Sequence, residues 1–216
     1  MALVRVSGFT ISIDGFGAGP DQTKENPLGV RGEELHEWLV GTATFKSMSG
    51  KAGGSTGVDD DLARRSMDGV GAWIMGRNMF GPVRGPWPDE SWRGWWGKNP
   101  PYHAPAFVLT HHERPSLHME GGTVFHFETG GIHPALERAR EAAGDRDIRV
   151  LGGVGIIRQF LSARLLDELH LAVSPRILGK GEHLFHGMDL LELGYNISHH
   201  VSSPDAMHIF VNRTQG

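Results

Sequence analysis

Glycine-rich corners are the parts of this sequence best suited to bind a ligand. In segment 149–161 an apolar run meets Gly152, Gly153 and Gly155 and continues with apolar positions at helical spacing, which predicts a strand, a corner and a helix. Glycine has no Cβ, so a ligand can approach the backbone while the first N–H groups and the positive dipole end of the helix point at it. The corner therefore suits a phosphate, and we expect Gly153 to tolerate no side chain. Taken alone, such a corner is more often only a tight turn, and Arg158 stands where the dinucleotide fingerprint has a third glycine.

A second corner of this kind follows the apolar strand predicted at 70–75. Gly76 is followed directly by Arg77, whose guanidinium can pair with phosphate oxygens in a fixed fork geometry. Two such corners on one sheet can contact a pyrophosphate from both sides, which a single corner cannot do. This duplication weakens the alternative that Arg77 is only a surface arginine after a turn.

Two further strand ends carry polar side chains. Ser12 and Asp14 come at the end of the strand predicted for 3–13, where an open α/β sheet binds its ligand, although Asp14 also suits a simple turn. The strand predicted at 106–109 ends at Thr110 and is followed by two histidines and an arginine. These groups suit the adenosine side of a cofactor, and their positive charge favours a 2′-phosphate.

Other residues with chemical potential have simpler explanations. Asp59-Asp60-Asp61 begins the helix predicted at 62–67, where acidic residues complement the helix dipole, so capping explains them better than catalysis. The 13 histidines include no helical His-x-x-x-His pair or His-x-His pair with supporting carboxylates, so no metal site is predicted. The aromatic and proline residues of 87–102 are equally consistent with stacking walls for a flat heterocycle and with a cover over a core or a dimer face.

The elements that position these residues predict an α/β protein. We expect strands at 122–127, 148–151 and 168–174 in addition to those above, and helices at 33–40 and 132–143. Alternating strands and helices predict a single three-layer α/β/α domain over 1–216 with a mixed, mainly parallel sheet. A hairpin of 193–201 with 207–211 adds antiparallel C-terminal strands, and 47–57 is expected to be a mobile loop.

Composition excludes several classes of function. The chain has 216 residues, 39% hydrophobic content, a net charge of −4 and no cysteine. Its net charge provides no overall positive potential that would attract nucleic acid. Without cysteine it forms no disulfides. We therefore expect a cytoplasmic protein without membrane or nucleic-acid partners.

An ordered set of short motifs carries a resemblance. The chain resembles the dihydrofolate reductase-like superfamily and, within it, the reductase domain of the bifunctional riboflavin-biosynthesis deaminase/reductase. The matching segments span almost the whole chain: 12–16, 75–80, 108–111, 152–153, 165–169 and 175–181.

The resemblance implies NADPH as the cofactor, hydride transfer to a small heterocycle and, often, a cis peptide between the paired glycines. We also expect a homodimer. The resemblance implies two sets of cofactor-binding residues. The phosphate and adenosine set is Gly76, Arg77, Asn78, Thr110 and His111, and the pyrophosphate and nicotinamide set is Gly152, Gly153, Val154, Gly155 and Ile156.

The chain also departs from its relatives. Dihydrofolate reductases place a carboxylate on the helix before the Met-Gly-Arg strand, where this chain offers only Asp59-Asp60-Asp61, and segment 17–66 is an insertion relative to a minimal reductase. These departures argue against dihydrofolate and against riboflavin synthesis.

We therefore expect an NADPH-dependent reductase of a small heterocyclic (pteridine-, pyrimidine- or flavin-like) or conjugated compound. Ser12 and Asp14 would contact the substrate, and the proton would come from Asp14 or from a nearby water. The alternatives are a catalytically silent nucleotide-binding protein and an interaction module of the same fold.

Overall fold

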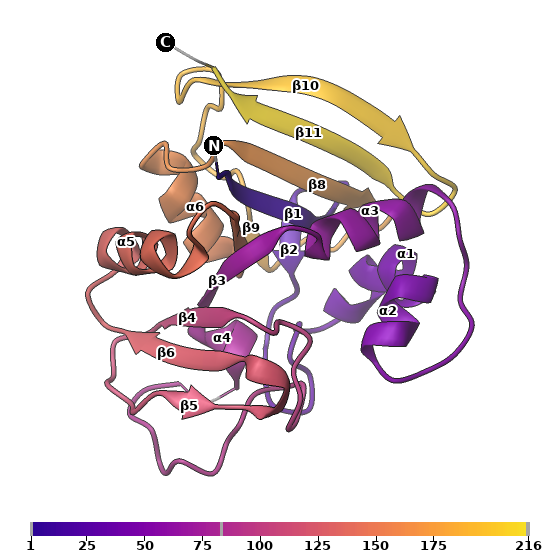
Figure 1. Cartoon of the computed structure of the whole chain (residues 1–216). Coiled ribbons are helices and arrows are strands. Elements are labelled where there is room, and N and C mark those ends of the chain that lie inside the picture. Colours follow the sequence, from indigo (N-terminus) through magenta and orange to yellow (C-terminus); the bar gives the residue numbers. More distant parts are fainter. Residues whose placement is uncertain (1, 83, 215–216) are drawn as a thin grey trace.

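A nine-stranded mixed sheet forms the centre of the protein (Figure 1). The computed structural model describes residues 2–82 and 84–214. The strands lie in the order β10-β11-β8-β1-β7-β3-β4-β6-β5. Neighbouring strands from β8 to β6 are all parallel, and the antiparallel pairs are β10 with β11, β11 with β8, and β5 with β6. The predicted mixed sheet with antiparallel C-terminal strands is confirmed.

The strand bounds follow the apolar runs of the sequence. In chain order the strands of the large sheet are β1 (Val4–Ser12), β3 (Val70–Gly76), β4 (Pro105–Leu109), β5 (Leu117–His118), β6 (Val124–Glu128), β7 (Asp147–Gly152), β8 (Glu168–Ser174), β10 (Tyr195–Ser202) and β11 (Met207–Arg213). Every residue of β3 is buried, as expected for a central parallel strand that is covered on both faces.

Helices cover both faces of the sheet. On one face α5 (Ile132–Ala143) and α6 (Val154–Ser162) pack over alternate strand residues such as Ala72 and Ile74. On the other face Trp73 and Met75 contact the short helix α4 (Arg77–Phe80) and the aromatic segment that follows it. The helices α1 (Glu37–Val40), α2 (Ala43–Met48) and α3 (Val58–Met67) lie together at one side of the molecule (Figure 1).

The segment 17–66 contains more structure than its composition indicates. It includes β2 (Phe16–Ala18), which starts one residue earlier and pairs with β9 (Glu182–His183) in a separate two-stranded sheet, and a 3₁₀ turn, Gly32–His36. The predicted mobile loop 47–57 is wrong at its ends. Residues 47 and 48 belong to α2, and Ser55 exchanges backbone hydrogen bonds of 2.9 Å with Gly41 and Ala43.

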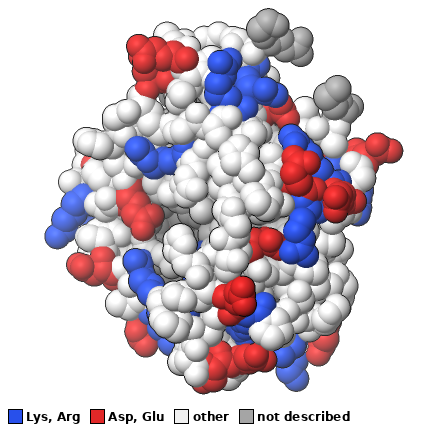
Figure 2. All heavy atoms as spheres, turned by 90° about the vertical axis from the view of Figure 1, so that its left-hand side faces the viewer, with Lys and Arg blue, Asp and Glu red and all other residues white. Residues whose placement is uncertain are grey.

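On the face shown in Figure 2, basic and acidic side chains are interspersed, so this face carries no extended patch of one charge. Across the described residues, the helices fall short of the length and apolar content needed to traverse a bilayer. The expectations of a homodimer and of no nucleic-acid partner stay predictions.

Candidate functional site

Four neighbouring strands carry the residues singled out from the sequence. Ser12 ends β1, Gly152 ends β7, Gly76 ends β3, and Thr110 follows β4, and these strands lie side by side in that order. Because all four run parallel, their carboxyl ends meet at one edge of the sheet, which is where open α/β sheets bind ligands. The fold therefore brings the predicted site residues to one edge.

The two glycine corners touch each other. Met75 is the register partner of Gly152 in the β3–β7 pair. A Cβ built on Gly76 would lie 2.9 Å from Ile156 Cγ1 and 3.4 Å from the Gly152 carbonyl oxygen. Only glycine at 76 allows this approach, so the corner after β3 and the corner after β7 form one backbone-lined surface.

The start of α6 leaves backbone donors free for a ligand. The Gly152–Gly153 peptide is cis, as the resemblance implies. Ile156 and Ile157 both donate backbone N–H groups to the Gly153 carbonyl, at 3.0 and 3.2 Å. The N–H groups of Val154 and Gly155 precede these bonds and have no partner within the helix, which is the arrangement that binds anions at helix N-termini.

The protein leaves room for a Cβ at Gly153, so the predicted clash with the start of the helix is wrong, whereas the predicted clash with a bound cofactor stays a prediction. A Cβ at Gly153 would meet no protein atom within 4 Å, and its φ of −72° is ordinary. The constrained position is Gly152, with φ of 122° and a Cβ that would lie 2.9 Å from Phe9 Cε2.

Arg77 lies against the aromatic segment. Its guanidinium carbon is 3.5 Å from the centre of the Trp87 ring, and Nη1 donates to the Gly85 carbonyl and, at 3.5 Å, to Thr110 Oγ1. Burial, with a smaller contribution from the charge of Arg114, lowers the pKa of Arg77. Its Nε and Nη2 atoms are buried without a partner among the described residues, so the side chain retains unused donors for an anion.

Thr110, His111 and Asn78 have unequal access to a ligand. Thr110 is buried, and its hydroxyl accepts the His112 N–H at 3.2 Å, whereas His111 is exposed. Asn78 is exposed, and its side-chain amide donates to Gln22 Oε1 at 3.3 Å. Thr110 therefore organises its own turn, and His111 and Asn78 remain accessible to a cofactor.

The Asp14 carboxylate stabilises the loop that follows β8 by accepting backbone hydrogen bonds. Its two carboxylate oxygens accept the backbone N–H groups of Leu178 at 3.1 Å and Gly179 at 2.7 Å. Partial burial raises the pKa of Asp14, but hydrogen bonds from the Ser12 hydroxyl and from Gly179 and Leu178 outweigh it, so the pKa lies below its ordinary value. The Ser12 hydroxyl is buried and accepts the Phe16 N–H at 3.0 Å. Both side chains therefore shape the turn after β1, and their predicted contact with substrate stays a prediction.

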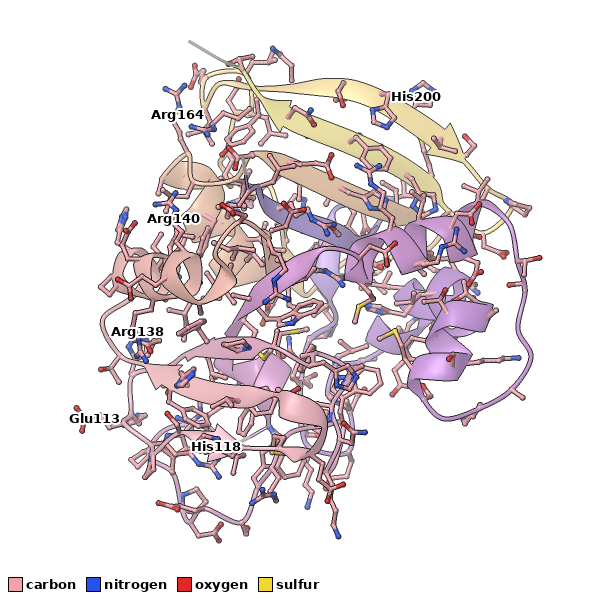
Figure 3. All side chains as sticks on the ribbon, viewed as in Figure 1. Glu113, His118, Arg138, Arg140, Arg164 and His200 are labelled. Carbon is pink, nitrogen blue, oxygen red and sulfur yellow. The ribbon has the colours of Figure 1, made fainter. Side chains whose placement is uncertain are left out.

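An open groove of about 1190 Å³ lies between the side formed by α2 and α3 and the segment before β4. Figure 3 shows that α5, which carries the labelled Arg138 and Arg140, is on the opposite side of the molecule. The groove residues combine apolar, hydroxyl, amide and charged side chains: Ala43, Thr44, Ser47, Met48, Ser49, Gly50, Lys51, Asp60, Arg64, Met67, Asp68, Trp95, Trp96, Asn99, Pro101 and His103.

For the aromatic segment the structure shows one of the roles left open by the sequence, the cover over a core, and a stacking wall for a heterocycle stays a prediction. Trp87 packs edge-on against Phe80 and Phe127 and so covers a core. Trp95 and Trp96 line the groove, and Trp95 Nε1 donates to the Asn78 carbonyl at 3.0 Å. Because Asn78 belongs to α4, which follows Gly76, the Trp95 end of the groove lies against α4, whereas Met67 and His103 place another part of it beside the starts of β3 and β4.

Sequence reasoning missed a buried polar chain that reaches α3. His170 of β8 and His208 of β11 are buried and hydrogen-bonded to each other. His208 also forms a hydrogen bond with Asp59 of α3. The signal was present, because each histidine interrupts an otherwise apolar strand and a buried histidine requires partners. The described residues contain no cluster of three or more His, Cys, Asp or Glu side chains that could hold a metal ion.

The mainly parallel sheet and the adjoining glycine corners at its carboxyl edge define an α/β fold. The chain belongs to the family of the RibD C-terminal domain, whose model matches residues 6–209. The predicted resemblance is thereby confirmed, and membership supports an oxidoreductase. A sequence comparison with curated proteins gave no match.

Solved structures share the fold at low sequence identity. A proposed riboflavin biosynthesis protein from Shewanella sp. PV-4 is 20% identical, with a TM-score of 0.57 and full coverage of both chains. A pyrimidine reductase-like protein from Corynebacterium diphtheriae is 16% identical, with a TM-score of 0.52 over 100% of this chain and 93% of that one. The deaminase/uracil reductase of Thermotoga maritima is 14% identical, with a TM-score of 0.54, and the match covers 99% of this chain and 57% of that longer protein.

Proposed function

We propose that the protein is an NADPH-dependent reductase of a small flat heterocycle of the pteridine, pyrimidine or flavin type. The observation that carries this proposal is the contact between Gly76 and the Gly152 corner at the free first turn of α6. That contact gathers backbone donors at a place where no Cβ intrudes, which suits a pyrophosphate. Family membership supports the oxidoreductase class.

The residues present fit the dinucleotide. A side chain at 76 would fill the space between the corners, and Arg77 keeps two buried nitrogens without partners. The backbone of 152–156 would hold the pyrophosphate and the nicotinamide side. Arg77, Asn78 and His111 would hold the adenosine side, where a guanidinium favours a 2′-phosphate.

The groove is the proposed substrate site. Its tryptophans offer flat apolar surfaces, and Asn99, His103 and the hydroxyl residues of α2 offer hydrogen bonds to ring nitrogens and carbonyls. When bound, the reduced nicotinamide supplies a hydride to a ring carbon of the substrate.

The substrate heteroatom also needs a proton, from a group within ~2.6–3.2 Å or through one water. A carboxyl group with a lowered pKa is ionised near neutral pH. We therefore assign proton donation to a water molecule at the substrate, with Asp14 stabilising the turn after β1, and keep direct donation by Asp14 as the alternative.

Fluorescence titration and turnover test the proposal. NADPH should quench tryptophan fluorescence at saturation, and a panel of pteridines, pyrimidines and flavins should include at least one compound that causes loss of NADPH absorbance. Gly76→Val should weaken NADPH binding by about tenfold or more, because the new side chain meets Ile156 and the Gly152 carbonyl. Gly41→Val is the matched control, since its Cβ would meet only the Glu37 carbonyl at 3.7 Å.

Two results would contradict the proposed function. Absence of NADPH binding by the wild type would remove the cofactor assignment. Binding without turnover on the whole panel would favour the catalytically silent alternative.

A further inference from the structure

A buried chain of hydrogen bonds connects the sheet to α3. The Gly8 N–H donates to His170 Nδ1 at 3.0 Å, His170 Nε2 lies 3.0 Å from His208 Nδ1, and His208 Nε2 lies 2.8 Å from Asp59 Oδ1. Because a backbone N–H can only donate, His170 Nδ1 carries no proton, so Nε2–H donates to His208. His208 Nε2–H then donates to Asp59, and both imidazoles are neutral and fully satisfied.

The three consecutive aspartates at the start of α3 have three different partners. Asp59 accepts from His208 of the sheet. Asp60 Oδ1 accepts the Thr44 N–H of α2 at 2.7 Å, and Asp61 Oδ1 pairs with Arg64 Nη2 within α3 at 2.5 Å. The first turn of α3 is therefore a junction between the sheet, α2 and the groove.

Polar contacts contribute more than apolar packing to the position of α3. The buried residues of α3 are Asp60, Ala63 and Ser66, which are polar or small. At the other end of the helix, Arg149 Nη1 donates to the Ser66 carbonyl at 2.9 Å, and Arg5 Nη2 donates to the Asp68 carbonyl at 2.5 Å. These arginines satisfy carbonyls that the helix end leaves free.

The face of α3 next to these anchors borders the groove. Asp60, Arg64 and Met67 lie three or four residues apart and therefore share one face of the helix, and all three border the groove. Asp60 also links α3 to α2, which forms the adjoining wall. A displacement of Asp59 would therefore move both walls on this side.

We propose that His208 and Asp59, supported by His170, are positioning residues that fix the α2–α3 wall of the groove. They touch neither cofactor nor substrate in this assignment, and they act through the placement of Asp60 and Arg64. The proposal deepens the proposed function and rests on it, because it treats the groove as the substrate site.

Hydrogen exchange on the full chain tests the positioning role without a ligand. Asp59→Ala removes the acceptor at the end of the chain, and amides of 42–51 and 58–64 should then exchange about tenfold faster or more, while those of 154–162 keep their rates. Asp59→Asn keeps an acceptor oxygen for His208 and should restore near wild-type rates. The control Tyr195→Phe removes another buried hydrogen bond, from the Tyr195 hydroxyl to the Leu166 carbonyl, and should leave 42–64 unchanged.

Unchanged exchange in 42–64 of Asp59→Ala would overturn the proposal. So would an equal increase in 154–162, because that result indicates general loosening of the protein and no specific positioning.

Pterin, a fluorescent pteridine, tests the link to the groove. Asp59→Ala should bind pterin about fivefold more weakly or worse with an unchanged NADPH dissociation constant, and Asp59→Asn should recover the affinity. Wild-type affinity for pterin in Asp59→Ala would refute the positioning role. If the wild type binds no pterin, the pteridine part of the proposed function fails, and hydrogen exchange still decides whether Asp59 positions the wall.

Discussion

Acidification should destabilise the protein through His170. Burial, with smaller contributions from nearby basic side chains such as Arg65 and Arg149, lowers the pKa of His170 from 6.5 to about 3. Between these values the unfolded chain binds a proton at this imidazole and the folded chain does not, so stability falls as the pH falls from 6.5 towards 3. For a change from pH 7 to pH 5, linkage gives a loss of about 2 kcal/mol from this one group.

The comparison with His170→Gln isolates this contribution. A glutamine can accept the Gly8 N–H and donate to His208 without titrating, and the carboxylates and other histidines respond equally in both proteins. Urea unfolding at pH 7 and pH 5 should show a wild-type loss that exceeds the variant's by about 2 kcal/mol, or about 4–8 °C in Tm. Equal losses in the two proteins would mean that folded His170 takes up a proton, and the assigned direction of the hydrogen-bond chain would be wrong.

The remaining predictions concern the glycine corners and the strand ends. Arg77→Ala should weaken NADPH binding by about 1.5–3 kcal/mol and leave NADH binding nearly unchanged, measured by fluorescence titration. Equal losses for the two nucleotides would place Arg77 away from the 2′-phosphate. Gly152→Ala should lower Tm, because of its φ of 122° and the contact with Phe9, whereas Gly153→Ala should keep the Tm of the parent. A parent-like Tm for Gly152→Ala would contradict the steric argument. Asp14→Asn should keep NADPH binding and lose less than about tenfold in kcat, and a loss of about 10²–10⁴-fold would instead assign proton donation to Asp14.

The sequence predicted best those structural features that depend only on residues close together in the chain. An apolar run that ends in glycine specifies both a buried strand and a corner, so the positions of Gly76 and Gly152 and the bounds of β8 and α5 follow from short segments. The parallel sheet then follows from the alternation of strands and helices, and it requires their carboxyl ends to meet at one edge.

Contacts between distant segments were not accessible in the same way. Asp59 and His208 are separated by 149 positions, and composition alone assigns the acidic run of α3 to helix capping. The helix α2 was not predicted, and its last two residues were assigned to the loop 47–57. Its start is fixed by Thr42, whose hydroxyl accepts the Phe45 N–H, and by Asp60 of another helix. The side chain of Arg77 could not be oriented either, because Trp87 reaches it through an irregular segment.

The attachment of α3 by its ends has a consequence for how this protein can diversify. The anchors Asp59, Arg5 and Arg149 contact the helix from the sheet side, and Met67 borders the groove while also packing against the sheet core. Arg64, by contrast, is exposed and borders the groove. With the groove as the proposed substrate site, substitutions at Arg64 should change which compound is accepted at little cost in folding free energy. In that assignment, the residues that hold α3 are separate from an exposed residue of its groove face, so a change of specificity would need only single substitutions on one helix.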